Sequence, residues 1–136
     1  MITPAGPERA QGLITSTYIK DPSDPAWAND PAMKDYFAFM AKYYPDGNPK
    51  ETLHAYGYVV TQVLQKVLEQ CNGNFSRESI MAQANNLKNL QIGLMLPGIP
   101  VNTSLTNHHP LRHIQLQRWV DKAWVPFGGI IEGSNI

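Results

Sequence analysis

The sequence has 136 residues, which is the length of one domain. Hydrophobic residues make up 43% of it and charged residues 16%, so the chain can build a core but carries few charges. A formal net charge of zero argues against a nucleic-acid surface, which needs clustered lysine and arginine. The single cysteine, Cys71, excludes an internal disulfide and is expected to be a small buried hydrophobe. No apolar run is long enough to span a bilayer, and Met1 to Gly6 lack the pattern of a signal peptide.

The first third of the chain predicts a strand, a loop and a helix start. Residues 1–11 are expected to form an irregular lead-in. Residues 12–19, GLITSTYI, are rich in β-branched residues and predict a strand. Residues 20–31 hold three prolines and predict a loop, because proline removes a donor and restricts the residue before it. Asp30 then suits a helix N-cap, and Pro31 suits the first turn.

Two helices follow at residues 33–44 and 48–73. The first has a broad apolar face made of Met33, Tyr36, Phe37, Phe39, Met40, Ala41, Tyr43 and Tyr44. Its aromatic density is more typical of packing than of a ligand box. The second is the most clearly amphipathic stretch, with an apolar face made of Leu53, Tyr56, Gly57, Val60, Leu64, Val67, Leu68 and Cys71. Asn48 and Pro49 suit its start and Asn72-Gly73 a left-handed end, so we expect a core helix packed on a sheet.

The remaining elements become shorter and then turn to β-structure. Ser76 predicts the N-cap of a third helix with an apolar stripe from Ile80 to Leu87. Residues 90–101, LQIGLMLPGIPV, predict a short strand that runs into a kinked crossing segment. The alternation from Ile114 to Phe127 predicts a tight hairpin with Asp121-Lys122 at its turn. Gly128-Gly129 is expected to end the hairpin, with residues 130–133 trailing off.

The chemistry-bearing residues do not predict an enzyme. His108, His109 and His113 carry three imidazoles that a transition metal could use, but Pro110 breaks the segment and no cysteine or carboxylate lies near in sequence. A solvent-facing loop is the favoured interpretation, and a metal-dependent enzyme is the weakest alternative. No Gly-x-Ser-x-Gly nucleophile motif and no glycine-rich phosphate loop occur. We therefore expect neither catalysis nor a cofactor.

Four stretches, taken in order, resemble one family. They are GLITSTYIKDPSDPAW, AYGYVVTQVLQKVLEQC, LMLPGIPVNTS and IQLQRWVDKAWVPFGGII. Together they resemble the C-terminal portion of the periplasmic solute-binding proteins of branched-chain amino acid (Leu/Ile/Val-type) ABC transporters. The similarity runs from about Gly6 to Gly133, and the order of the stretches makes it specific.

The resemblance implies an α/β chain that forms part of a type I periplasmic-binding-protein fold. Such receptors have two lobes joined by three crossing segments, with the ligand in the cleft between the lobes. Residues 1–136 would be the C-terminal segment of a two-lobe protein. Residues 12–89 would supply a strand and three helices of a Rossmann-like lobe part. Residues 90–133 would supply a crossing strand near the hinge and the C-terminal β-hairpin.

The resemblance also implies a function, which is capture of an amino acid or related small carboxylate for an ABC importer. The implied partners are the solute and the ABC permease of the intact parent, and the implied location is the periplasm. Most of both lobes has no counterpart here, so we expect a piece of a parent receptor or a truncated gene product. A partial cleft desolvates a small polar solute poorly, so full affinity is not expected.

Five residues are candidates for ligand contact. Tyr18 ends the first predicted strand, and open α/β sheets bind ligands beyond the carboxyl ends of their strands. His54 and Tyr56 lie in the first turns of the central helix, where free N–H groups attract anions. Thr103 and Ser104 follow the kinked segment and are placed to line the hinge. For each of them the alternative is a purely structural role.

A second function hypothesis comes from the same incompleteness. A chain that carries part of a two-lobe fold exposes apolar faces that neighbouring segments would cover. Such faces favour dimers or exchanged elements. The alternative is therefore a self-associating structural or interaction domain that binds no solute, and a homo-oligomer is expected for the isolated chain.

Overall fold

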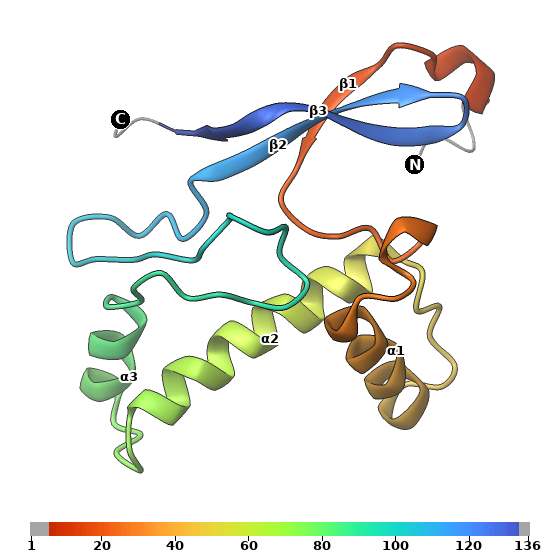
Figure 1. The fold of residues 1–136 in the computed structure, drawn as a ribbon. Coiled ribbons are helices and arrows are strands. Elements are labelled where there is room, and N and C mark those ends of the chain that lie inside the picture. Colours follow the sequence, from red (N-terminus) through yellow and green to blue (C-terminus); the bar gives the residue numbers. More distant parts are fainter. Residues whose placement is uncertain (1–5, 134–136) are drawn as a thin grey trace.

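The computed structural model describes residues 6–133, so the expectations for residues 1–5 and 134–136 lie outside it. Within that range the helices are α1 (Pro31–Tyr43), α2 (Thr52–Gln70) and α3 (Arg77–Ala84). The strands are β1 (Ile14–Thr17), β2 (His113–Val120) and β3 (Ala123–Glu132). Two short 3-10 helices are η2 (Pro7–Ala10) and η3 (Pro25–Trp27). Figure 1 shows the sheet as one layer and the helices as another, joined by the segments that leave β1 and enter β2. The mixture of helices and strands confirms the α/β class. No helix in the described range is long and apolar enough to span a membrane.

The sheet is antiparallel in the order β1-β2-β3. The β2–β3 connection is the tight hairpin that the sequence predicts, with Trp119 opposite Trp124. Its two turn residues, Asp121 and Lys122, have positive φ values of 48° and 67°. Two consecutive left-handed residues match the twist of the flanking strands, which is why this turn type closes two-residue hairpins.

The expectation that Gly128-Gly129 ends the hairpin is wrong. Strand β3 continues to Glu132, and its register shifts where Leu116 pairs with Phe127 and Gln115 pairs with Ile130. The two glycines form a bulge there, and Gly128 has a φ of 69°, which glycine adopts without strain. The Gln115 side chain closes the bulge, because its Nε2 donates to the Phe127 carbonyl at 2.7 Å.

The helix boundaries agree with the sequence except at two points, the start of α2 and the end of α3, which stops at Ala84 and leaves Leu87 of the predicted stripe beyond it. Helix α1 begins at Pro31 as predicted, and Ser76 accepts from the N–H of Ser79 at the start of α3. Helix α2 begins at Thr52, so the predicted start at Asn48 is wrong. The Asn48 side chain instead accepts from the N–H of Lys50 at 3.0 Å, which is a local turn that competes with helix capping. At the other end, the positive φ of Asn72 and Gly73 confirms the left-handed cap.

The core lies between α1, α2 and the segment 90–101. The largest fully buried side chains are those of Met33, Tyr36, Leu94 and Ile99. Segment 90–101 forms no regular strand, so that part of the prediction is wrong. Two isolated bridges, Leu90 with Val101 and Ile19 with Met95, fix its course, and its apolar side chains fill the core. None of the residues in the three strands is buried.

The buried side of α2 differs from the predicted one. Ala55, Val59 and Val67 are buried against the core, of which only Val67 belongs to the predicted face. The predicted residues Leu53, Tyr56, Val60 and Leu64 are 77%, 44%, 48% and 51% exposed. Apolar residues occupy more than half of the circumference of this helix, so their periodicity alone does not predict which face packs against the core. The cover is the segment 90–101 rather than the three-stranded sheet (Figure 1).

Candidate ligand-binding site

The chain leaves β1 beside the core segment. The N–H of Lys20 donates to the Leu94 carbonyl at 2.9 Å, and the N–H of Leu96 donates to the Tyr18 carbonyl at 2.9 Å. These two bonds run on either side of the bridge between Ile19 and Met95. Residues 18–20 are therefore clamped to residues 94–96 at the point where the chain passes from the sheet to the helices.

Tyr18 and Tyr56 lie within electrostatic reach of each other in this region. Tyr18 is half-buried and packs against the core cluster, whereas the Tyr56 side chain in the second turn of α2 is exposed. Burial raises the pKa of the Tyr18 hydroxyl, and the negative charge of an ionised Tyr56 raises that pKa further. Such coupling requires that the two phenols lie near each other. A strand end and a helix start thus bring two hydroxyl-bearing rings into the same region of the molecule.

His54 is tied to the loop before α2. Its Nδ1 lies 2.8 Å from the Asn48 carbonyl oxygen, and its ring meets the Tyr44 ring edge-on at 5.5 Å between centroids. His54 and Tyr56 are two residues apart on a helix, so their side chains point in different directions. The imidazole consequently supports the start of α2 rather than the Tyr18–Tyr56 pair.

Thr103 and Ser104 lie in a different part of the molecule. The Thr103 hydroxyl accepts from the N–H of Leu87 at 2.9 Å and donates to the Ala84 carbonyl at 2.6 Å, which ties it to the end of α3. The Ser104 hydroxyl accepts from the N–H of Asn107 at 3.0 Å within a local turn. Helix α3 lies near the C-terminal end of α2, whereas β1 leads to its N-terminal half (Figure 1). The structure therefore does not bring these hydroxyls to the tyrosine pair.

Lys20 and Asp30 form a largely buried ion pair that the sequence analysis did not predict. The Lys20 side chain is 7% exposed, and its Nζ donates to Asp30 Oδ2 and to the Gly93 carbonyl, both at 2.7 Å. Burial favours a higher pKa for the Asp30 carboxyl, but the hydrogen bonds from Lys20 and from the Met33 N–H lower that pKa overall. A lysine directly after the predicted strand was the available signal, and its partner Asp30 was predicted only as the N-cap of the following helix.

The three candidate histidines do not converge. His108 Nδ1 lies 2.8 Å from Asn85 Oδ1, and His113 Nε2 lies 3.9 Å from Glu132 Oε2. Between residues 6 and 133, no three histidine, cysteine, aspartate or glutamate side chains gather closely enough to hold a metal ion.

The aromatic residues of α1 behave as packing. Tyr36 is fully buried and its hydroxyl donates to the Pro49 carbonyl at 3.0 Å. Its ring lies 5.5 Å from that of Phe37 and 5.3 Å from that of Tyr58, centroid to centroid. Burial, with the nearby Asp35 carboxylate for Tyr58, raises the pKa of the Tyr36 and Tyr58 hydroxyls. The helix pair α1–α2 is thus held by an aromatic cluster rather than opened as a ligand box.

The fold and the sequence together define a class of protein. A sequence profile described as "periplasmic binding protein" matches residues 1–123. The chain belongs to the periplasmic binding protein family, which confirms the resemblance seen in the sequence. A search of curated proteins gave no match.

A solved structure gives the same fold. The crystal structure of a branched chain amino acid ABC transporter from Thermus thermophilus with bound valine superposes with a TM-score of 0.76 at 12% sequence identity. The match covers 98% of this chain and 36% of that one. The described residues therefore form part of a periplasmic-binding-protein fold, and the chain spans about a third of the length of this relative.

Proposed function

We propose that the chain forms part of a solute-binding site for an amino acid or a related small carboxylate. Family membership supports the solute-binding role, and the structural relative is itself described with bound valine. The observation that carries the location is the electrostatic proximity of Tyr18 and Tyr56, near the point where the chain crosses from the sheet to the helices. His54 would contribute only if its imidazole left the Asn48 carbonyl, and Thr103 and Ser104 would contribute only if the region beyond α3 took part.

The chemistry of this region suits an amino acid. Glu51 occupies the N-cap position of α2 without a side-chain hydrogen bond, so the first N–H groups of the helix are left for another acceptor. A solute carboxylate is such an acceptor, because the helix N-terminus carries partial positive charge. The exposed Tyr56 ring offers an apolar surface to the solute side chain and a hydroxyl for a hydrogen bond.

Calorimetric titration with valine, glutamine and phenylalanine tests the proposal. Because the chain spans 36% of its solved relative, we expect weak binding, with a dissociation constant on the order of 1 mM. Tyr56→Ala should weaken that binding at least about tenfold, since ring and hydroxyl are both lost. Tyr43→Ala is the matched control, because Tyr43 is an equally large exposed tyrosine on α1. Equal losses in the two variants would argue against the site.

The wider biological setting is proposed on the same basis. The chain would act without catalysis as the C-terminal segment of a receptor for an ABC importer, with a permease as protein partner and the periplasm as location. Residues 12–89 would belong to one lobe, and residues 90–133 would lead across the hinge to the terminal hairpin. Cell fractionation with the native gene tests the location, and recovery in the cytoplasm would contradict it.

A second candidate function is self-association. The observation that favours it is the number of large apolar side chains left open in the described residues, including Leu53 on α2, Phe75 before α3 and Ile131 on β3. Monomeric proteins rarely leave contiguous apolar patches uncovered. Sedimentation at micromolar concentration tests this candidate, and a stable compact monomer would contradict it.

A further inference from the structure

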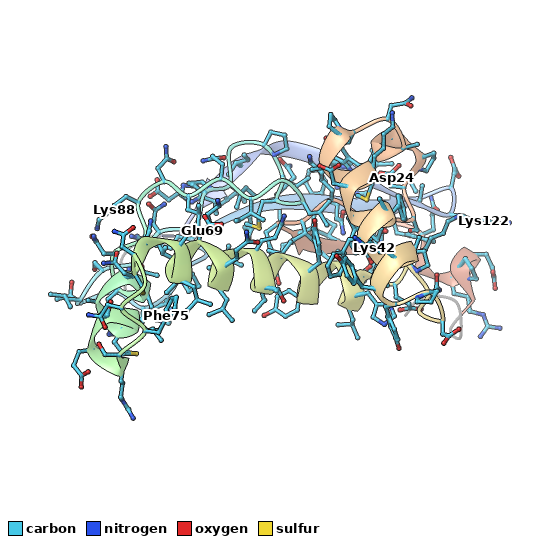
Figure 2. The ribbon with its side chains drawn as sticks, turned by 90° about the horizontal axis from the view of Figure 1, so that it is seen from below. Asp24, Lys42, Glu69, Phe75, Lys88 and Lys122 are labelled. Atoms are coloured by element: carbon cyan, nitrogen blue, oxygen red, sulfur yellow. The ribbon has the colours of Figure 1, made fainter. Side chains whose placement is uncertain are left out.

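Helix α2 carries a contiguous apolar surface that faces away from the core. We call Leu53, Tyr56, Gly57, Val60 and Leu64 the open stripe, because all five are exposed. Figure 2 views the molecule from below; most of α2 crosses this view uncovered, with α1 at its N-terminal end and Phe75 beside its C-terminal end. Starting from Leu53, the other members follow at positions +3, +4, +7 and +11, a spacing that keeps the open stripe on one side of the helix over three turns.

Gly57 lies in the middle of the open stripe. A side chain built there would meet no other atom within 4 Å, so no contact inside the described molecule requires a glycine. Glycine weakens a helix interior relative to alanine. The Gly57 carbonyl is already engaged, since the Thr61 hydroxyl donates to it at 2.9 Å. Because no contact within the described residues requires a glycine at position 57, its missing side chain is available to permit close approach of a second backbone at the centre of the apolar surface.

A groove adjoins the stripe at its C-terminal end. It has a volume of about 420 Å³ and is lined by Thr61, Leu64, Gln65, Leu68, Glu69 and Phe75. At the other end of the stripe, Leu53 is the most protruding of these residues and is 77% exposed. One end of the surface thus projects an apolar side chain, and the other end holds an apolar hollow.

We propose that this surface is an interface with a second copy of the chain. In an antiparallel two-fold pairing of two α2 helices with the axis near Val60, Leu53 of each copy enters the groove of the other. Every residue on a two-fold axis faces its own copy, so a charged stripe would repel itself. The open stripe has no charged residue, and the whole chain has a formal net charge of zero. An uncharged stripe lowers the electrostatic cost of pairing identical surfaces, and the carboxylate that lines the groove, Glu69, is paired with Lys66.

The available area agrees with a stable pair. The exposed fractions of the open stripe and Phe75 amount to roughly 600 Å², so a pair would bury at most about 1,200 Å², which is the lower bound for specific stable interfaces. This inference rests on the self-association proposed above and adds the surface that carries it. Because the pair covers Tyr56, the dimer would not bind a solute at that residue.

Sedimentation velocity of the full chain at about 50 µM tests the interface. We expect a dimer for the native chain and a rise of about 30-fold or more in its dissociation constant for Val60→Asp, because a buried unpaired charge is expensive. Gly57→Ala should weaken the dimer while raising the melting temperature of the monomer, since alanine favours the helix. Leu105→Asp is the control, because Leu105 is 80% exposed in a loop away from α2. It should leave the dimer intact.

The outcomes separate the two claims. A native chain that is monomeric at this concentration overturns both self-association and the interface. A native dimer that Val60→Asp and Gly57→Ala leave unchanged overturns the α2 interface alone. Oxidation of a Val60→Cys variant adds a second measurement, because cysteines beside a two-fold axis should form a covalent dimer. The native chain should not, since its only thiol, Cys71, is buried. Failure of Val60→Cys to cross-link in a dimeric sample also overturns the proposed axis.

Discussion

Lys20 Nζ lies 2.7 Å from Asp30 Oδ2, while the other oxygen of the same carboxylate accepts from the N–H of Met33 at 3.0 Å. One carboxylate therefore caps α1 and neutralises a buried ammonium. Lys20 also donates to the Gly93 carbonyl, so the exit of β1, the start of α1 and the core segment meet at this ion pair.

Removing one partner of this pair should destabilise the fold strongly. Because Asp30→Ala leaves the Lys20 ammonium buried without a counter-charge, we expect a loss of about 3 kcal/mol or more in the free energy of unfolding. Urea denaturation followed by circular dichroism measures it. Glu69→Ala is the matched control, since Lys66 and Glu69 are both about half exposed and such pairs contribute less than about 1 kcal/mol. Equal losses in the two variants would contradict a structural role for the buried pair.

The Asp30 carboxyl should also make the free energy of unfolding depend on pH in the acidic range. The folded-state pKa of Asp30 is lowered from its ordinary value of 3.8, so its contribution is present above that value and is lost as the pH falls through the folded pKa. We expect the free energy of unfolding to fall below about pH 4. Asp30→Asn should flatten this fall, and an unchanged pH profile in that variant would show that other carboxyls cause it.

The turn of the hairpin offers a stabilising change. Asp121 and Lys122 both hold positive φ, which costs a residue other than glycine roughly 1 kcal/mol. Replacing them together by Asn and Gly should raise the free energy of unfolding by about 1 kcal/mol, because that pair is preferred in this turn. Thermal denaturation checks this. Gly128→Ala should lower the free energy of unfolding, because Gly128 has a φ of 69°, which strains a residue with a side chain. A gain in stability in this variant would contradict the bulge.

The proximity of Tyr18 and Tyr56 can be tested by titration. The pKa of the Tyr18 hydroxyl is raised above 10.0, first by burial and second by Tyr56, so ionisation of Tyr18 should follow that of an exposed tyrosine. In the Tyr56→Phe variant the Tyr18 midpoint should move to lower pH, while the effect of burial remains. NMR of tyrosine-labelled protein resolves the two midpoints. A Tyr18 midpoint that does not respond to Tyr56→Phe would place the phenols apart.

Local sequence signals located most of the elements. Asp30-Pro31, Ser76 and Asn72-Gly73 mark helix ends through interactions within a few residues, so the sequence predicts them well. The turn at Asp121-Lys122 was recognisable because alternating residues flank it. Asn48 misled the prediction, since the same side chain can close a turn or cap a helix.

Contacts distant in the sequence were not predictable from local patterns. The choice of Val59 rather than Val60 for the core depends on where residues 90–101 pass over α2, which no periodicity reveals. The pairing of Lys20 with Gly93 joins segments 73 residues apart. The proximity of Tyr18 and Tyr56 also depends on this long-range packing, although strand-end and helix-start positions had marked each of them separately.

A titration of isotopically labelled chain with L-valine, followed by two-dimensional ¹H–¹⁵N NMR, tests most directly whether the tyrosine pair binds a solute. We expect saturable shifts confined to the amides around Tyr18 and the first two turns of α2, with D-valine producing smaller ones. Shifts that are absent at about 10 mM valine, or that are centred instead near Thr103 and α3, would contradict the proposed site.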